Sequence, residues 1–296
     1  MKKILIYLCI SLLLFFQNGG LLAQEYSVMS FNIRYDNIHD TENSWENRKA
    51  GVVELLNFYH PDVFGIQEAL FHQVNYIDSS LVNYTYLGVG REGCNEGEFS
   101  AIFYDTTKFR LEATSTFWLS ETNDAVSIGW DAALERICTY GLFENIKSKK
   151  RNWVFNTHFD HIGEKAREKS AQLVLSKVDE LNKDELPIIL MGDFNSTPKS
   201  KPIQIFKSQL SDASEISAKP IYGPKGTFNG FEPNQIIDAR IDYIFTSKLS
   251  VLSHMHIDDR LNNNSFVSDH LPVFVTVKDT INKIENSSNA NNFDKQ

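Results

Sequence analysis

The sequence predicts an α/β (α+β) fold in which short strands alternate with amphipathic helices. Apolar runs of strand length stop at turn residues, as in residues 186–198 (LPIILMGDFNSTP). Other stretches carry apolar residues at helical spacing, as in residues 164–181. The chain has 296 residues, of which 42% are hydrophobic, which is enough for one sizeable core. We therefore expect a single domain over residues 24–278.

In the first half, the strand at residues 26–34 places Met29, Phe31 and Ile33 on one face. Asn43 and Glu46 resemble a capping box, which predicts the start of a helix that ends at His60. The elements expected next are a strand at 61–68, a helix at 70–81, a hairpin pair at 84–90 and 99–104, and a strand at 110–119.

The second half continues the alternation. Strands are expected at 137–143 and 152–160, then the helix at 164–181, and then the apolar strand that ends on Gly192. The last two strands are expected at 240–246 and 273–277. We find no Pro/Gly/Ser linker and no internal repeat, which supports one undivided domain.

The two ends of the chain differ from this body. Lys2 and Lys3 precede an apolar stretch at residues 4–16, and Ala23 offers a small residue for cleavage. This pattern predicts a secretory signal peptide over residues 1–23, too short to span a bilayer comfortably, with an uncleaved anchor as the alternative. Residues 279–296 are polar, which predicts a disordered tail. We expect a secreted or periplasmic protein with no transmembrane anchor after cleavage and no stable protein partner.

The charge balance restricts the function. A formal net charge of −9 argues against a tight nonspecific grip on nucleic acid, because such binding relies on Lys and Arg at phosphates. It is compatible with a site that collects divalent cations. Cys94 and Cys138 could pair in an oxidising compartment, but two cysteines leave the question open.

Asp193 and Asn195 are two residues apart after an apolar strand, so on an extended backbone their side chains point the same way. The carboxylate can hold or deprotonate a water, and the amide can donate to a negative oxygen without adding charge. This pairing suits attack on a phosphate ester. The alternative is an ordinary turn, which these residue types also favour.

Further polar residues lie at or near the ends of predicted strands, and each alone is also compatible with a turn or an ion pair. The full set is Asn32, Glu68, His158, Asp193, Asn195, Asp242, Asp269 and His270. Paired sheets bring such positions together at one end of a sandwich, where the carboxylates would repel each other without a cation. Oxygen ligands favour Mg²⁺, with Mn²⁺ possible, and no Cys/His zinc spacing competes.

Six short motifs occur in a fixed order: SFNIR, IQE, NTHFD, GDFNSTP, RIDYIF and SDHLP. With them the chain resembles the endonuclease/exonuclease/phosphatase superfamily, whose members include deoxyribonuclease I-like nucleases and phosphatases. The resemblance implies a four-layer sandwich with two mixed β-sheets face to face, flanked by helices. A branch of secreted bacterial members is especially similar.

The resemblance also implies roles. Glu68 is the expected principal metal ligand, with Asn32 and Asp269 beside it. Asp193 orients or deprotonates the attacking water, and Asn195 stabilises the transition state. His270 is expected to hydrogen-bond the phosphate or to act as acid or base. Asp242 fixes its tautomer, and His158 contacts the phosphate. Whether Asp193 or His270 is the base stays open.

Arginines complete the predicted site. Some relatives carry an acid where this chain has Arg34, so we expect Arg34 to touch substrate or pair with an acid. Arg91 and Arg136 lie in the segments GVGREG and GWDAALER and are predicted to contact substrate. A surface salt bridge is the alternative for Arg136. Trp118 and Trp130 could line the pocket, with core packing as the alternative.

These observations predict a secreted, Mg²⁺-dependent phosphoesterase that acts by metal-assisted in-line attack of water. Its substrate would be a phosphodiester, as in a nuclease, or a phosphomonoester of a small phosphorylated molecule. The alternatives are a sphingomyelinase or phospholipase C-like enzyme, an inositol or sugar phosphate phosphatase, and a non-catalytic binding module on the same fold.

Overall fold

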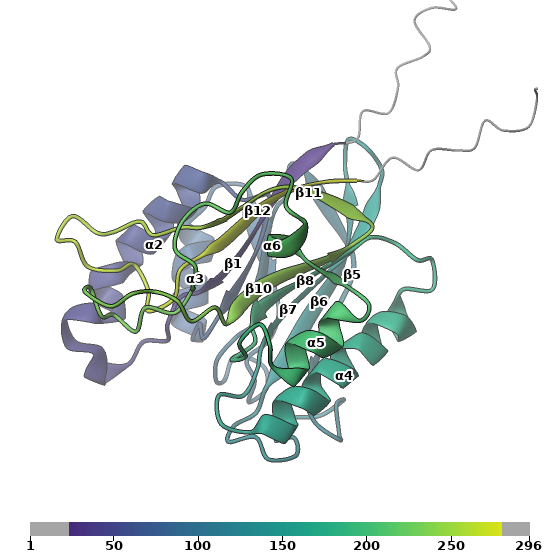
Figure 1. Cartoon of the computed structure of the whole chain (residues 1–296), viewed down its shortest axis with the longest axis horizontal. Coiled ribbons are helices and arrows are strands. Elements are labelled where there is room, and N and C mark those ends of the chain that lie inside the picture. Colours follow the sequence, from purple (N-terminus) through teal and green to yellow (C-terminus); the bar gives the residue numbers. More distant parts are fainter. Residues whose placement is uncertain (1–23, 280–296) are drawn as a thin grey trace, which may run out of the picture.

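The computed structural model describes residues 24–279 as four layers, with two six-stranded mixed sheets face to face and helices outside (Figure 1). The predicted sandwich is therefore confirmed. The expected signal peptide lies outside the described residues, and so does the expected tail except for Asp279, which is the last residue of a strand. Among residues 24–279, no helix combines the length and the apolar character that crossing a bilayer requires.

The first sheet has the order β11-β12-β1-β2-β4-β3. Its strands are β1 (Glu25–Asn32), β2 (Val63–Gln67), β3 (Tyr84–Leu87), β4 (Ile102–Asp105), β11 (Leu249–His256) and β12 (Val273–Asp279). The second sheet has the order β5-β6-β7-β8-β10-β9. Its strands are β5 (Phe109–Trp118), β6 (Ile137–Asn145), β7 (Arg151–His158), β8 (Ile188–Asp193), β9 (Ser211–Asp212) and β10 (Asp242–Ser247).

Helices cover both outer faces. Beside the first sheet lie the 3₁₀ helix η1 (Ile38–Asn43), α2 (Trp45–Tyr59) and α3 (Phe71–Ser80), and beside the second lie α4 (Glu164–Leu181) and α5 (Lys201–Lys207) (Figure 1). The short α6 (Ala213–Ile216) contacts β10 and β11, one strand of each sheet, and its Ala213 packs in the core between the sheets. Apolar residues of α2 and α3 pack on the outer face of the first sheet. Those of α4 and α5 pack on the second sheet. Each fully buried aliphatic or aromatic side chain stabilises the fold by about 1.5–3 kcal/mol.

A buried polar contact joins the two sheets across their inner faces. Asn156 of β7 accepts a hydrogen bond from Gln67 Nε2 of β2 at 2.6 Å. Its own Nδ2 donates to the carbonyl oxygens of Ile66 and Ala101 at 2.9 and 2.8 Å. Gly65 leaves room for this side chain, because an added Cβ would lie 2.6 Å from Asn156 Cγ. These bonds satisfy a buried amide and hold the two sheets together.

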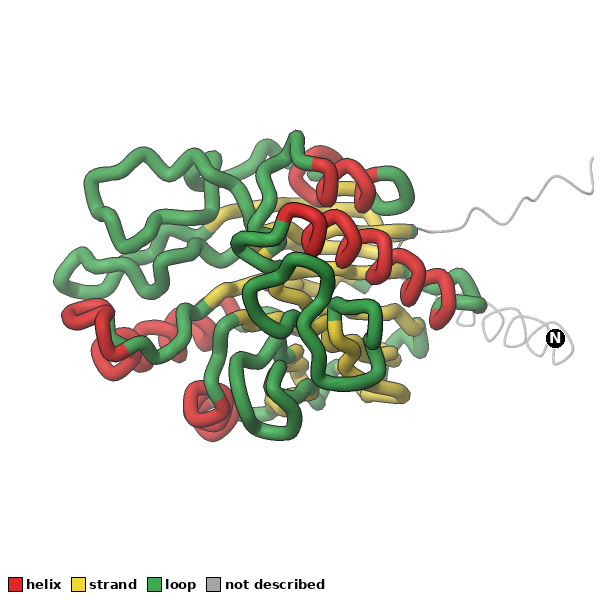
Figure 2. The backbone as a smooth tube through the Cα atoms, turned by 90° about the horizontal axis from the view of Figure 1, so that it is seen from below, coloured by secondary structure: helices red, strands yellow, loops and turns green. Residues whose placement is uncertain are grey.

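The topology gathers the polar strand ends at one edge. Each sheet has one parallel pair, β1 with β2 and β7 with β8, so all four strands end at that edge. The antiparallel strands β10 and β12 begin there, with Asp242 paired opposite Asp193. The described chain begins and ends at the other edge, where Glu25 pairs with Lys278, and Figure 2 shows the loops gathered away from it.

Local predictions were wrong in several places. Asn43 ends η1 instead of capping α2, and Ser44 precedes α2 without a side-chain cap bond. The strand expected at 99–104 begins only at Ile102, because Phe99 forms isolated bridges with Ala69 and Gly90. Five elements were not predicted, namely η1, β9, α5, α6 and β11. For β11 the reason is the preceding turn, in which Lys248 adopts a positive φ of 58° without a glycine to signal it.

Candidate functional site

Polar side chains from the ends of both sheets meet in a cluster made of Asn32, Glu68, Asp193 and His270. Asn32 Nδ2 lies 2.9 Å from Glu68 Oε1, 3.1 Å from Asp193 Oδ2 and 3.5 Å from His270 Nε2. Asn32 ends β1, Glu68 follows β2 and Asp193 ends β8, so three separate strands supply the contacts. The structure therefore brings these predicted site residues together across 238 positions of sequence.

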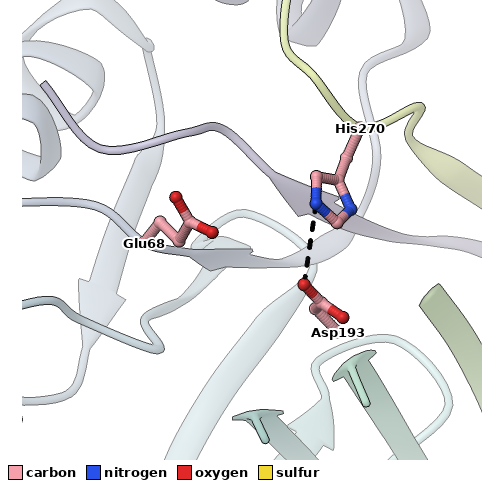
Figure 3. A group of neighbouring side chains, drawn as sticks. All are labelled: Glu68, Asp193 and His270. Atoms are coloured by element: carbon pink, nitrogen blue, oxygen red, sulfur yellow. Dashed lines mark ion pairs between the residues drawn. The ribbon is translucent and has the colours of Figure 1, made fainter. Parts of the chain in front are cut away.

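The cluster has the donors of a metal site. One ligand atom from each of Glu68, Asp193 and His270 lies within 4.8 Å of the others (Figure 3). Burial, and then the nearby Asp242 carboxylate, raise the pKa of Asp193 to about 7, which shows that negative charge is costly here. A divalent cation would relieve that cost, so the residues present fit one. Asn32 differs from the expectation: its Oδ1 accepts the Arg34 N–H at 3.0 Å, and its nitrogen faces the carboxylates.

His270 is held by a second carboxylate. Its Nδ1 lies 2.8 Å from Asp242 Oδ2, and both side chains are buried. Burial opposes the charged form of His270, but Asp242 and Asp193 outweigh it and raise the pKa of His270 well above its usual value. Asp242 thus fixes the ring, which leaves Nε2 toward the cluster, 3.7 Å from Asp193 Oδ2.

Asn195 and His158 lie on the other side of Asp193. The Asn195 N–H donates to Asp193 Oδ1 at 2.9 Å, and Asn195 Nδ2 lies 3.1 Å from His158 Nε2 and donates to Phe159 O at 3.0 Å. Burial, and then the Arg136 guanidinium, hold the pKa of His158 well below its usual value, so this imidazole is neutral. A neutral ring and an amide therefore flank the Asp193 carboxylate.

The turns that carry these residues are strained. Arg34, Glu68 and Asn195 have positive φ values of 60°, 63° and 45°, and none of them is glycine. Such conformations cost about 1–3 kcal/mol each and persist where the surroundings over-determine them. Each turn follows a strand that ends at the cluster. The positive φ turns the chain sharply there, and Glu68 meets Asn32 as a result.

A pocket of about 600 Å³ opens over the cluster. Charged residues of its wall are Arg34, Arg91, Glu98 and Arg136, and apolar residues are Leu134, Phe228 and Ile241. Asp269, at 3.7 Å from Arg34 Nη1, also lines it. Trp118 and Trp130 are not among the lining residues. Trp118 instead donates its Nε1–H to the Arg91 carbonyl at 2.6 Å, and it supports the wall from behind.

The three predicted arginines differ in their partners. Arg34 makes a bidentate ion pair with Asp40 at 2.9 and 3.0 Å, so it pairs with an acid and also lines the pocket. Arg91 Nη1 lies 2.8 Å from Glu98 Oε2. Arg136 Nη2 contacts His161 Nδ1 at 2.9 Å, and within residues 24–279 Arg136 makes no ion pair. The salt bridge considered for Arg136 is therefore absent there, and a buried guanidinium without a carboxylate faces the pocket.

Glu98 was missed from sequence. Its Oε2 lies 2.8 Å from Arg91 Nη1 and 3.8 Å from His158 Nδ1. Burial, and then the Glu68 carboxylate, raise the pKa of Glu98 to about 7. The residue lies in a loop with other acids, Glu92 and Glu96, and no periodic pattern separates it from them.

The cysteines that were left open are both free, with Cys94 exposed and Cys138 buried.

Comparisons with known proteins agree with this geometry. The model of the Endonuclease/Exonuclease/phosphatase family matches residues 29–270. A family protein from Bacteroides thetaiotaomicron is 38% identical with a TM-score of 0.84, and the match covers 88% of this chain and 99% of that chain. The mannosyl-6-phosphatase of the same organism is 39% identical with a TM-score of 0.82, with coverage of 85% and 99%.

A viral protein is also similar to this chain over most of its length. An uncharacterized protein of Acanthamoeba polyphaga mimivirus is 26% identical over 255 residues, which are 78% of this chain and 91% of that protein. The family match spans most of the described residues and ends on the motif that carries His270. The chain belongs to the endonuclease/exonuclease/phosphatase family, and it is a phosphoric ester hydrolase.

Proposed function

We propose that this protein is a Mg²⁺-dependent phosphomonoesterase that acts on small phosphorylated sugars. The observation that carries the proposal is Arg136, which is only 5% exposed, lines the pocket over the cluster and has no carboxylate partner among the described residues. A buried, unpaired guanidinium is costly until an anion neutralises it. A phosphomonoester brings up to two negative charges, whereas a diester brings one. Similarity to a mannosyl-6-phosphatase supports a phosphorylated sugar as the substrate.

The cation would be held by Glu68, with Asp269 beside it, and it would polarise the phosphoryl oxygens. Asn32 turns its amide nitrogen to Glu68 and would orient that carboxylate instead of binding the cation. Mn²⁺ could replace Mg²⁺. Asp193 is the better candidate for the base. Asp242 and Asp193 raise the pKa of His270 and so favour its charged form, which donates a proton and does not accept one. Asp193 Oδ1 accepts the Asn195 N–H, and Oδ2 points to the cluster, where it would take the proton of a water.

The remaining residues bind the phosphoryl group. His270 would donate from Nε2 to a phosphoryl oxygen while Asp242 holds Nδ1. Asn195 would donate to the oxygens from the opposite side by exchanging one of its present contacts, His158 Nε2 or Phe159 O, for the substrate. Arg136 would neutralise the additional charge of the monoester, and Arg34 would stay paired with Asp40 at the rim.

A phosphodiester substrate is the second candidate, because Asn195 also borders a second cavity of about 690 Å³. Its basic residues Lys165, Arg167 and Lys201 could hold the far half of a diester. The acidic residues Asp131, Glu164 and Glu168 line it as well and offset that charge. The formal net charge of −9 does not favour a long nucleic acid.

The test is a substrate panel with the purified domain, residues 24–279. We expect Mg²⁺-dependent phosphate release from mannose 6-phosphate or glucose 6-phosphate, abolished by EDTA and by Asp193→Asn. Inositol phosphate, bis(p-nitrophenyl) phosphate, single-stranded DNA and sphingomyelin complete the panel. Faster hydrolysis of the diester or of DNA would favour the second candidate. No hydrolysis with any metal would favour the remaining alternative, a non-catalytic binding module.

Secretion forms part of the proposal, supported by the charge and hydropathy pattern of residues 1–23 alone. Expression of the full chain in a bacterial host, followed by N-terminal sequencing of the periplasmic fraction, tests it. We expect a new N-terminus near Gln24. Retention of Met1 on a membrane-bound product would support the uncleaved anchor.

A further inference from the structure

Glu98 and Arg91 form a fixed polar pair on the pocket wall. Glu98 Oε2 lies 2.8 Å from Arg91 Nη1, and the Glu98 side chain is 14% exposed. Both residues come from the loop between β3 and β4. The Arg91 N–H donates to the Glu98 carbonyl at 3.0 Å, and Trp118 donates to the Arg91 carbonyl from outside the loop. The pair is therefore held in place before any ligand arrives.

This pair has unused hydrogen-bonding capacity. The contacts of Glu98 involve Oε2, which leaves Oε1 without a partner among the described residues. Arg91 Nε and Nη1 are also buried there without a hydrogen bond, since the approach of Nη1 to Glu98 is an ion pair and does not have hydrogen-bond geometry. A carboxylate acceptor beside a guanidinium donor matches two neighbouring hydroxyl groups, because each hydroxyl can donate to one partner and accept from the other.

Other residues of the same pocket are apolar. Phe228, Leu134 and Ile241 line it, and the Phe228 ring packs at 5.1 Å from the His270 ring. A sugar ring has an apolar face of C–H groups and an edge of hydroxyl groups. A pocket that combines an aromatic residue with a carboxylate–guanidinium pair suits such a molecule, since its face and its edge need different partners.

We propose that Glu98, together with Arg91, is a hydroxyl-binding subsite that recognises neighbouring hydroxyl groups of the phosphorylated sugar and so determines substrate specificity. The inference rests on the proposed function. It identifies the part of the pocket that selects the sugar, which is the alcohol component of the phosphate ester. Arg136 neutralises the charge of the phosphate, whereas Glu98 binds hydroxyl groups of the sugar. An ester without hydroxyl groups gains nothing from Glu98.

Glu98 has two other possible roles, and they predict different kinetics. If Glu98 only orients His158, its loss lowers kcat for every phosphoester by the same factor. If it only neutralises Arg91, its loss lowers stability. A subsite instead changes the ratio of kcat/KM between a sugar phosphate and phenyl phosphate, which has no hydroxyl groups on its ring.

The test compares the wild-type domain with Glu98→Gln, which keeps the size of the side chain and removes its charge. We expect the ratio of kcat/KM, sugar phosphate over phenyl phosphate, to fall about 10–100-fold, because a charged hydrogen bond to substrate is lost. The sugar substrate is whichever of glucose, mannose and galactose 6-phosphate the wild type hydrolyses best. Glu96→Gln is the matched control, since Glu96 is exposed in the same loop, and it should leave the ratio unchanged.

Deoxy sugars provide an independent test. The 2-, 3- and 4-deoxy analogues of the sugar phosphate should each be measured with both proteins. We expect at least one analogue to lose activity with the wild type and to lose far less with Glu98→Gln, because the missing hydroxyl no longer has its partner. Calorimetric titration with the free sugar should show weaker binding to the variant. Should Glu98→Gln not fold, Glu98→Asp keeps the charge and should show part of the change.

The outcomes separate the two proposals. An active wild type whose ratio is unchanged in the Glu98 variants, with additive deoxy effects, overturns the subsite and leaves the proposed function standing. A wild type that hydrolyses phenyl phosphate but no sugar phosphate overturns both. An equal loss of kcat on all substrates would mean that Glu98 only orients His158, and it also overturns the subsite.

Discussion

His270 Nδ1 lies 2.8 Å from Asp242 Oδ2, and both side chains are buried where β10 begins. The contact joins the loop before β12 of the first sheet to a strand of the second sheet. It thus couples the orientation of an imidazole at the site to the packing of the two sheets, and both catalysis and stability should depend on it.

Asp242→Asn should lower kcat about 100-fold or more, because the His270 ring loses the carboxylate that fixes and charges it. Steady-state kinetics at saturating Mg²⁺ measures this loss. Asp238→Asn, an exposed acid in the preceding loop, is the control and should retain full activity. Unchanged kcat in Asp242→Asn would remove His270 from the mechanism.

The same pair predicts a pH dependence of stability. The pKa of His270 is raised in the folded state, so the pair stabilises fully below the unfolded pKa of about 6.5. That contribution is lost as the pH rises through the higher folded pKa. Urea unfolding at pH 6 and pH 9 should therefore show a larger difference between wild type and Asp242→Asn at pH 6. An equal difference at both values would mean that His270 is neutral in the folded protein.

Asp193→Asn should abolish activity and yet stabilise the metal-free protein. The pKa of Asp193 is raised from 3.8 to about 7, so its ionisation costs stability as the pH rises across that window. Removal of the charge should raise the free energy of unfolding at pH 8 by about 1–3 kcal/mol. Urea unfolding in EDTA measures the gain, and at pH 3, where the aspartate is protonated, the gain should disappear.

Arg136→Met should lower activity without lowering stability. Replacement of a buried, unpaired guanidinium by an apolar side chain of similar length should keep or raise the thermal unfolding temperature. The kcat/KM for phosphomonoesters should fall about 100-fold, as expected for a lost charged contact in the transition state. Mg²⁺ affinity, measured by calorimetry, should not change. A fall in stability together with unchanged kinetics would contradict the role of Arg136 in binding phosphate.

Asn156→Ala should destabilise the sandwich without touching the site. The substitution removes three buried hydrogen bonds, one from Gln67 Nε2 and one to each of the Ile66 and Ala101 carbonyls, at about 0.5–1.5 kcal/mol each. Gln67 Nε2 keeps its bond to Ser30 Oγ, and Ala101 O keeps its bond from the Ile66 N–H. We expect a total loss of about 3 kcal/mol, since the inner faces will partly relax. Asn262→Ala, at an exposed position, is the control and should stay within about 0.5 kcal/mol of the wild type.

The apolar pattern of the sequence determined the strands, the helices and the polar residues at the strand ends, and the resemblance carried by its motifs implied the sandwich. Strand-length apolar runs that end in polar residues are local patterns, and parallel neighbours must end together. Hence Asn32, Glu68, Asp193 and His270 could be named before their distances were known. Local pattern failed at the Lys248 turn and at the start of α2, where no side chain signals the backbone conformation.

Only the tertiary structure decided which of these groups face each other and which lack a partner. Glu98 approaches Arg91 and His158, Arg136 is left without a carboxylate among the described residues, and the Asn32 nitrogen faces the cluster. These relations depend on the register between strands and on loop conformation, which join positions far apart in the chain. No local periodicity encodes them, because hydrogen bonds and charge neutralisation act through space.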